Sequence, residues 1–313
     1  MHGIENRPAS ALCNGSIIMS EPTIPCARPS DPAEPSPSMQ TAQAMLADDG
    51  VARGMAQRDR LVQQSRVWEP FTRRILAQAG LRPGQRVLDA GCGAGGAMAL
   101  MAEIVGPNGR VSGLDIDDGI ARPAVQDLQR QGPAVFDYLD VDLETGDWAP
   151  EQPLDMVFAR RVMFHMGEPL AVLRRLWSWV RPGGTLLLMD TDLTVARSFP
   201  QLPVLERGMR LVNDAFRRAG HDIETGARLP AMLLEAGIGP AQASEVFSLI
   251  TGSLHGAALL RGTLASLAPV ILRHGLADAA ALARLDAALD AVESQPSTCR
   301  WPDLVATWKF KPR

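Results

Sequence analysis

The chain has 313 residues, of which 46% are hydrophobic, and its formal net charge is −4. This length supports one large core, with room for a small accessory region. The acidic balance lacks the basic surface that nucleic acids and anionic membranes attract, so we expect neither as a partner. The sequence contains no stretch of about 20 continuous apolar residues, so no membrane span is predicted. The four cysteines, at positions 13, 26, 92 and 299, lack metal-binding or redox spacing, so no metal site is predicted.

The N-terminal region divides into a tail and a helical segment. Residues 1–45 are rich in Pro, Ser and Ala without an apolar period, which predicts a disordered tail. Its apolar stretch is too poor for a secretory signal, so a cytoplasmic location is expected. Residues 46–80 carry apolar side chains three, four and seven apart, which predicts helices, divided at Pro70. We place these helices in a cap over a ligand pocket.

Residues 81–195 alternate between short apolar strands and amphipathic helices. Strands are predicted at 86–90, 110–115, 135–139, 154–159 and 185–190, and helices at 95–105, 118–131 and 168–180. Pro182, Gly183 and Gly184 are expected to form a tight turn before the last of these strands. Short apolar strands separated by helices favour a parallel sheet that is covered on both faces.

The regular alternation loosens after Asp190. Helices are predicted at 200–219, 228–237, 252–275 and 277–293, and strands at 243–250 and 303–310. The last strand alternates in polarity as a half-exposed strand does. We therefore assign residues 196–313 to substrate-cap helices and to strands that close the sheet.

A glycine-rich turn follows the first strand, and the residues around it indicate which ligand it suits. Gly91, Gly93 and Gly96 satisfy the G-x-G-x-x-G pattern of dinucleotide sites, in which the turn holds a pyrophosphate. Asp115 follows at the usual distance for a ribose-binding acid. Asp89, however, lies two residues before the first glycine, where it would repel a pyrophosphate and attract a cation. S-adenosylmethionine carries a sulfonium and an ammonium but no phosphate, so the turn indicates a methyl-donor pocket.

Several motifs, in order along the chain, resemble those of class I S-adenosylmethionine-dependent methyltransferases. They are VLDAGCG at 87–93, GLDI at 113–116, LDMVFAR at 154–160 with FHM at 164–166, and RPGGTL at 181–186. The resemblance spans about residues 60–195 and is closest to bacterial small-molecule enzymes of the ubiquinone/menaquinone type. It implies a Rossmann-like α/β fold with a mostly parallel seven-stranded sheet, helices on both faces and an added helical cap. Residues 81–195 would be the core that binds S-adenosylmethionine.

The resemblance also implies how the cofactor, S-adenosyl-L-methionine, is held. Asp89 would lie near the ammonium of its methionine part, where Gly91, Cys92 and Gly93 give close backbone approach. Asp115 would accept hydrogen bonds from both ribose hydroxyls, which needs an acceptor with two oxygens.

Further positions in the matching motifs would complete the donor site. Ile116 would pack on the adenine face. Asp142 and Leu143 fit the adenine edge, and Asp140 or Glu144 takes this role if the alignment shifts. At the end of the fourth strand, Ala159 and Arg160 would line the donor channel. Arg160 has a second interpretation, because its planar guanidinium suits an acidic group of the substrate.

The residue that acts on the acceptor is less well defined by the sequence. Methyl transfer is an in-line displacement, in which the protein aligns the nucleophile and excludes water. A hydroxyl acceptor benefits from a base with a near-neutral pKa, which favours histidine. His165 follows the fourth strand at the ligand-bearing edge and is the first candidate; helix capping or packing beside the donor is its structural alternative. His221 and His255, in the predicted cap, are further candidates.

The sequence as a whole predicts methyl transfer from S-adenosylmethionine to a small, fairly apolar acceptor. Oxygen is favoured as the acceptor atom, and a secondary metabolite or quinone-like phenol as the acceptor. Two alternatives remain open. The first is a nicotinamide-dependent oxidoreductase, supported only by the glycine spacing, and the second is a non-catalytic protein that binds S-adenosylmethionine.

Overall fold

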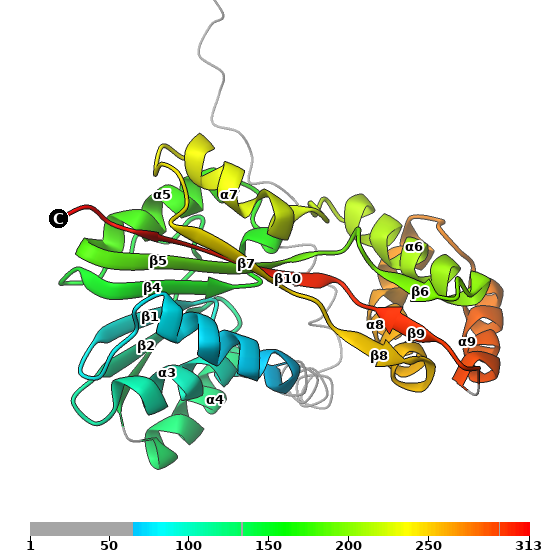
Figure 1. The fold of residues 1–313 in the computed structure, drawn as a ribbon, viewed down its shortest axis with the longest axis horizontal. Helices are drawn as coiled ribbons and strands as arrows, with labels where there is room; N and C mark the ends of the chain where they lie inside the picture. The colour runs from blue at the N-terminus through cyan, green and yellow to red at the C-terminus, as the bar shows by residue number, and fades with distance from the viewer. Residues whose placement is uncertain (1–64, 133, 294) are drawn as a thin grey trace, which may run out of the picture. The chain divides into compact units, whose positions relative to one another are not determined.

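The computed structural model describes residues 65–132, 134–293 and 295–313 (Figure 1). The predicted tail, residues 1–45, and the first part of the predicted N-terminal helices, residues 46–64, lie outside the described residues.

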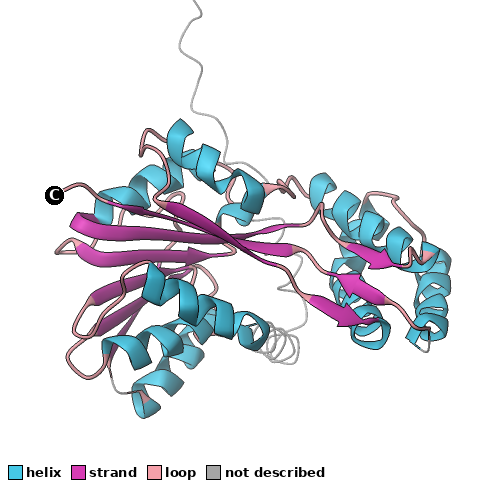
Figure 2. Cartoon of the chain, in the orientation of Figure 1, coloured by secondary structure: helices cyan, strands magenta, loops and turns pink. Residues whose placement is uncertain are grey.

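Seven strands form one mostly parallel sheet in the order β3-β2-β1-β4-β5-β10-β7. Figure 2 shows the strands in magenta and the helices in cyan. They are β1 (Arg86–Ala90), β2 (Arg110–Asp115), β3 (Val135–Asp140), β4 (Leu154–Arg160), β5 (Val180–Asp192), β7 (Ala243–Phe247) and β10 (Asp303–Phe310). Strands β1 to β5 pair in parallel, and β10 is antiparallel to β5 and β7. The predicted Rossmann-like sheet is confirmed.

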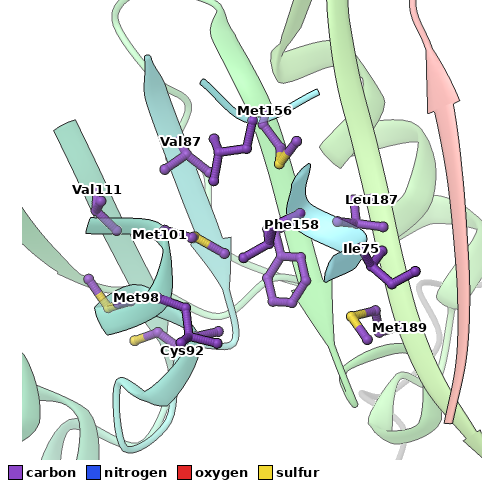
Figure 3. Packing of buried hydrophobic residues seen from close by; sticks show 14 of the residues in the cluster. Ile75, Val87, Cys92, Met98, Met101, Val111, Met156, Phe158, Leu187 and Met189 are labelled. Atoms are coloured by element: carbon purple, nitrogen blue, oxygen red, sulfur yellow. The ribbon is translucent and has the colours of Figure 1, made fainter. Parts of the chain in front are cut away.

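Two clusters of buried side chains cover opposite faces of this sheet, because successive strand residues point to opposite sides. On one face, Val87 and Phe158 pack against α3 (Gly96–Val105), α4 (Asp118–Gln131) and a helix over residues 65–78 (Figure 3). On the other face, Leu88 and Val157 pack against α5 (Pro169–Trp179) and α7 (Thr225–Glu235). We call these the first and the second cluster.

The helix over residues 65–78 corrects two expectations. It runs through Pro70 without a break, so the predicted division there is wrong. The proline removes one backbone donor, but Phe71, Ile75 and Leu76 beyond it are all buried in the first cluster. This packing keeps the segment helical, and it places the described part of the predicted N-terminal cap against the sheet.

The predicted turn at Pro182, Gly183 and Gly184 lies instead within β5, which begins five residues earlier than expected. The register between β4 and β5 shifts between Leu154 and Met156, as at a β-bulge. Bulges accommodate a proline that a regular central strand would exclude. The Gly183 amide donates to the Lys311 carbonyl at 2.9 Å, so the C-terminal segment satisfies the bulge.

A smaller set of elements, here called the accessory unit, has its own core. It contains α6 (Pro203–Arg218), α8 (Ser253–Arg273), α9 (Ala279–Glu293) and a sheet of β6 (Arg197–Phe199), β9 (Thr298–Arg300) and β8 (Ile250–Gly252). Its buried residues form a third cluster that also includes Phe164, from the loop after β4, and Leu193, beyond β5. Its three-residue strands were not predicted, because they are too short for an alternating pattern. Helix α7, expected in the cap, packs on the sheet instead.

Helix α8 is long and apolar enough to cross a membrane by length and composition. Its buried residues include Ala257, Leu260 and Leu264, which belong to the third cluster at helical spacing. Core helices of folded domains meet the same length criterion, so α8 is weak evidence for a membrane span.

Replacing Ile75 by Ala should lower the free energy of unfolding by about 2–5 kcal/mol, because the side chain is 0% exposed and its loss leaves a cavity. Val67→Ala is the matched control on the same helix, where the side chain is 38% exposed, and it should change stability little. Chemical denaturation measures both, and equal effects would contradict the packing of this helix in the core.

Candidate functional site

The parallel strands bring five charged side chains to one edge of the sheet. Asp89, Asp115, Asp140, Arg160 and Asp190 lie at or near the carboxyl ends of β1 to β5. The strand order reverses between β1 and β4, and sheets of this kind bind ligands at that point. The candidate site is therefore centred on the ends of β1 and β4.

Asp89 is a buried carboxylate with an unused oxygen. It is 2% exposed, and its Oδ2 has no hydrogen-bond partner among the described residues. Burial raises the pKa of Asp89 to about 7, the charge of Arg160 opposes this rise, and Asp115 adds to it. A buried acceptor without a partner is costly, so this oxygen points to a ligand that brings a hydrogen-bond donor or a positive charge.

The turn after β1 keeps its backbone close to the neighbouring strands. The amides of Gly91 and Cys92 both donate to the Leu114 carbonyl, at 2.6 and 3.0 Å. Gly91 has φ +82°, and a Cβ there would lie 2.4 Å from Val162 Cγ2 in the loop after β4. Glycine is therefore required by both conformation and space.

Cys92 contributes its backbone to this turn rather than its thiol. The side chain is buried in the first cluster beside Met98 (Figure 3), and its Sγ would lie 2.9 Å from a Cβ on Gly113. Burial, with Asp89 and Asp115 adding to it, raises the pKa of the Cys92 thiol above its ordinary value. A neutral buried thiol suits packing.

Two backbone amides orient the Asp115 carboxylate. Gly93 donates to Oδ2 at 2.7 Å, and Asp117 donates to Oδ1 at 2.9 Å. Burial raises the pKa of Asp115, while these hydrogen bonds oppose the rise. Each oxygen retains a second lone pair, so the carboxylate can accept two further hydrogen bonds from a ligand, as the predicted ribose role requires.

Arg160 is held by the helix over residues 65–78. Its Nη1 donates to Thr72 Oγ1 and its Nη2 to Ser65 Oγ, both at 2.9 Å. Burial lowers the pKa of Arg160 to about 10, and the Asp89 charge opposes this shift, so the guanidinium stays charged at neutral pH. A Cβ on Gly96 would lie 2.0 Å from Ser65 Oγ, so the start of this helix lies directly on the glycine-rich turn.

Sequence reasoning did not identify Ser65 and Thr72. Both are ordinary helix residues by pattern, and only the fold brings them to Arg160, 95 and 88 positions away.

The predicted adenine-site residues have other contacts in this structure. Asp142 Oδ1 accepts from the Glu144 amide at 2.8 Å, and Oδ2 accepts from Thr145 Oγ1 at 2.7 Å. Leu143 is buried in the second cluster. Ile116 is half-buried just beyond β2, and Asp140 is exposed at the end of β3. Both Asp142 oxygens thus stabilise a local turn.

The side chain of Ala159 is also buried in the second cluster, beneath the sheet face that α5 and α7 cover. Neighbouring Arg160 extends from the opposite face, so of this predicted pair Arg160 is the residue that lies with Asp89.

Sequence reasoning missed a second acid–arginine pair, which is formed by Asp190 of β5 and by Arg161, directly after β4. Asp190 accepts the Phe164 amide at Oδ2 (3.0 Å) and the Thr191 amide at Oδ1 (2.8 Å). Burial raises its pKa to about 6, opposed by these amides and by Arg161. Arg161 has φ 59°, an uncommon conformation for a residue other than glycine. The pair positions the loop after β4.

The candidate histidines separate in this structure. His165 is exposed in the 3-10 turn η1 (Met163–His165), and His255 is exposed on α8. His221, between α6 and α7, stacks on Phe164 with ring centroids 4.8 Å apart. The centroids of His165 and His221 are 5.3 Å apart. The fold therefore brings together two of the three candidates.

Comparison with known families identifies the core. A family model described as a methyltransferase domain matches residues 81–237, about half of the chain. The chain belongs to this methyltransferase family. Its core is a class I S-adenosylmethionine-dependent methyltransferase domain, and the matched range contains β1 to β5 and the glycine-rich turn.

Named relatives are similar in sequence to part of this chain. Phosphoethanolamine N-methyltransferase 1 of Arabidopsis thaliana is 29% identical over 170 residues, which cover 53% of this chain and 31% of that protein. Trans-aconitate 2-methyltransferase of Rhizobium rhizogenes is 35% identical over 120 residues, covering 38% and 44%. The chain thus spans less than half the length of either relative.

A solved structure supports the fold. A Bacillus halodurans protein described as a candidate methyltransferase superposes with a TM-score of 0.54, at 16% identity over 77% of this chain and 99% of that one. At this identity the similarity concerns the fold alone.

The residues at the edge of the sheet fit S-adenosylmethionine. The unpartnered Asp89 Oδ2 suits its ammonium, and the close-packed backbone of Gly91 and Gly93 allows near approach. Asp115, oriented by two amides, suits a vicinal diol. A pyrophosphate would instead meet two buried carboxylates, which is electrostatically unfavourable.

Asp115→Ala should weaken S-adenosylmethionine binding at least tenfold, because hydrogen bonds to a charged acceptor contribute about 1.5–3 kcal/mol each. Asp118→Ala is the control, since Asp118 pairs with Arg122 on the surface and should leave the affinity unchanged. Calorimetric titration measures both, and an unchanged Asp115→Ala affinity would contradict the ribose role.

Donor affinity should depend on pH through Asp89. A raised pKa means that the carboxyl group binds a proton below about pH 7, and a protonated carboxyl attracts the ammonium less. Affinity should therefore fall by about eightfold between pH 7.5 and pH 6. Asp89→Asn should bind more weakly and lose this dependence; the same pH profile in the variant would assign the titration to another group.

Proposed function

We propose that the protein transfers the methyl group of S-adenosylmethionine to a small-molecule acceptor. The observation that carries this proposal is the unpartnered, buried Asp89 oxygen beside the glycine-rich turn. It combines a cation-binding group with the close backbone approach of a nucleoside site, which suits this donor and not a dinucleotide.

The acceptor class is supported by the relatives and by the charge. The relatives' names specify trans-aconitate and phosphoethanolamine, both small molecules. A net charge of −4 does not favour nucleic acid or an anionic membrane. We further propose oxygen as the acceptor atom, membership of the ubiquinone/menaquinone-type group and a cytoplasmic location.

The chain's own residues bind and align the reactants. The sulfonium of the bound donor supplies an electrophilic methyl group and a neutral leaving group. Asp89 would hold the ammonium of the donor's methionine part, and Asp115 would hold its ribose. Arg160, fixed by Ser65 and Thr72, offsets part of the burial effect on Asp89 and so favours its ionised form. Phe164, which packs in the third cluster, joins the accessory unit to this edge and helps to exclude water.

Calorimetric titration with S-adenosylmethionine, S-adenosylhomocysteine, NADH and NADPH tests this proposal. We expect micromolar binding of the two sulfur nucleotides and none of the nicotinamides. Binding of a nicotinamide alone would contradict the proposal and favour an oxidoreductase. If the sulfur nucleotides bind but S-adenosylmethionine is not converted to S-adenosylhomocysteine in the presence of any small acceptor, a binding protein would be favoured.

A further inference from the structure

We propose that His221 takes the proton of an acceptor hydroxyl during methyl transfer, so that the acceptor is a phenol or an alcohol. This assignment rests on the proposed function and names the acceptor chemistry of the same site. It also moves the expected base from His165 to its neighbour.

The hydrogen bond of His221 determines its tautomer. Its Nδ1 lies 3.0 Å from the carbonyl oxygen of Phe164. A carbonyl can only accept, so in the neutral ring Nδ1 carries the hydrogen and Nε2 presents a lone pair. Burial lowers the pKa of His221, although the Phe164 bond opposes this. The ring is therefore a neutral, oriented proton acceptor at physiological pH.

His221 lies against the loop that contacts the glycine-rich turn. Val162 lies against Gly91, close enough that a Cβ on the glycine would be 2.4 Å from Val162 Cγ2. Phe164 follows two residues later, and the His221 ring stacks on it with an interplanar angle of 16°. His221 is only partly buried, so a ligand can approach its edge.

Asp190 acts as a positioning residue for this arrangement. The Phe164 amide donates to Asp190 Oδ2 at 3.0 Å, while the Phe164 carbonyl accepts from His221. One residue of the loop is thus held on both sides, by a buried carboxylate of β5 and by the imidazole. Such support keeps a base in place before a substrate binds.

The charged groups around His221 come from each neighbouring element. His165 lies beside it on η1, and Asp190 lies across Phe164. On its own loop, Asp222 accepts from Arg228 of α7 at 2.6 Å. On α6, Arg217 pairs with Asp214. Asp222 and Arg217 are therefore already paired with side chains of opposite charge, and Arg161 offsets the charge of Asp190.

The reaction balances with these groups alone. The acceptor oxygen forms a bond to the methyl carbon as its O–H bond breaks, and the proton passes to Nε2 of His221. The carbon–sulfur bond breaks, and its electron pair stays on sulfur as a neutral thioether. The positive charge that was on sulfur ends on the imidazolium, which then releases its proton to water.

A first test needs no acceptor. In the full-length protein labelled with ¹⁵N-histidine, the His221 signals are assigned by their loss in His221→Asn. We expect protonated Nδ1, unprotonated Nε2 and a pKa below the ordinary value of about 6.5. A proton on Nε2 in the neutral ring would overturn the proposal.

A second test compares variants on chosen acceptors. His221→Asn keeps a donor near the place of Nδ1 and removes Nε2. With phenol, whose pKa is about 10, kcat should fall about 10²–10⁴-fold, whereas 4-nitrophenol, ionised near neutral pH, should lose much less. The Kd for S-adenosylmethionine should not change. His274→Asn, on an exposed residue at the end of α8, is the matched control and should retain full activity.

The remaining outcomes also decide the question. A large loss in His165→Asn with none in His221→Asn would return the base to His165. Methylation of benzylamine but not of phenol, 4-nitrophenol or benzyl alcohol would overturn the hydroxyl class, as would methylation of none of them. In either case, if the protein still binds S-adenosylmethionine, the assignment of the donor site would stand. Failure to bind it would contradict the proposed function itself.

Discussion

The attraction between the buried carboxylate of Asp89 and the guanidinium of Arg160 determines what the edge of the sheet can bind. Burial favours the neutral form of both groups, so it raises the pKa of Asp89 and lowers the pKa of Arg160. The charge of each group opposes this shift in the other. The Arg160 hydrogen bonds go to Thr72 and Ser65, which leaves the Asp89 oxygen to a ligand. A cationic donor group at that oxygen would complete the site.

This interaction depends on packing far from it. Arg160 is held because the helix over residues 65–78 is buried through Ile75 and Leu76 in the first cluster. The glycine-rich turn can lie against that helix because Gly96 has no side chain to meet Ser65. On the acceptor side, Phe164 connects Asp190, His221 and the third cluster. Donor and acceptor regions thus share the loop that follows β4.

The sequence predicted the sheet and its glycine-rich turn because these depend on local patterns. Apolar runs at 86–90 and 110–115 match β1 and β2 residue for residue. Asp89 and Asp115 could be placed because strand ends are marked by the glycines that follow or by a change to polar residues. The bulge at Gly183 could not be found this way, because its sequence is typical of a turn. It is part of a strand because its backbone pairs with the distant segment at Lys311.

The partners of the charged residues were also beyond the sequence. Ser65 and Thr72 meet Arg160 only through the tertiary fold, and Phe164 links Asp190 to His221 through its backbone, which no side-chain pattern records. The crystal structure of the complex with S-adenosylhomocysteine would test the account most directly. We expect the ligand's ammonium within hydrogen-bonding distance of Asp89 Oδ2, with both ribose hydroxyls on Asp115. A ligand bound with its ammonium away from Asp89, and that oxygen still unpartnered, would contradict the account.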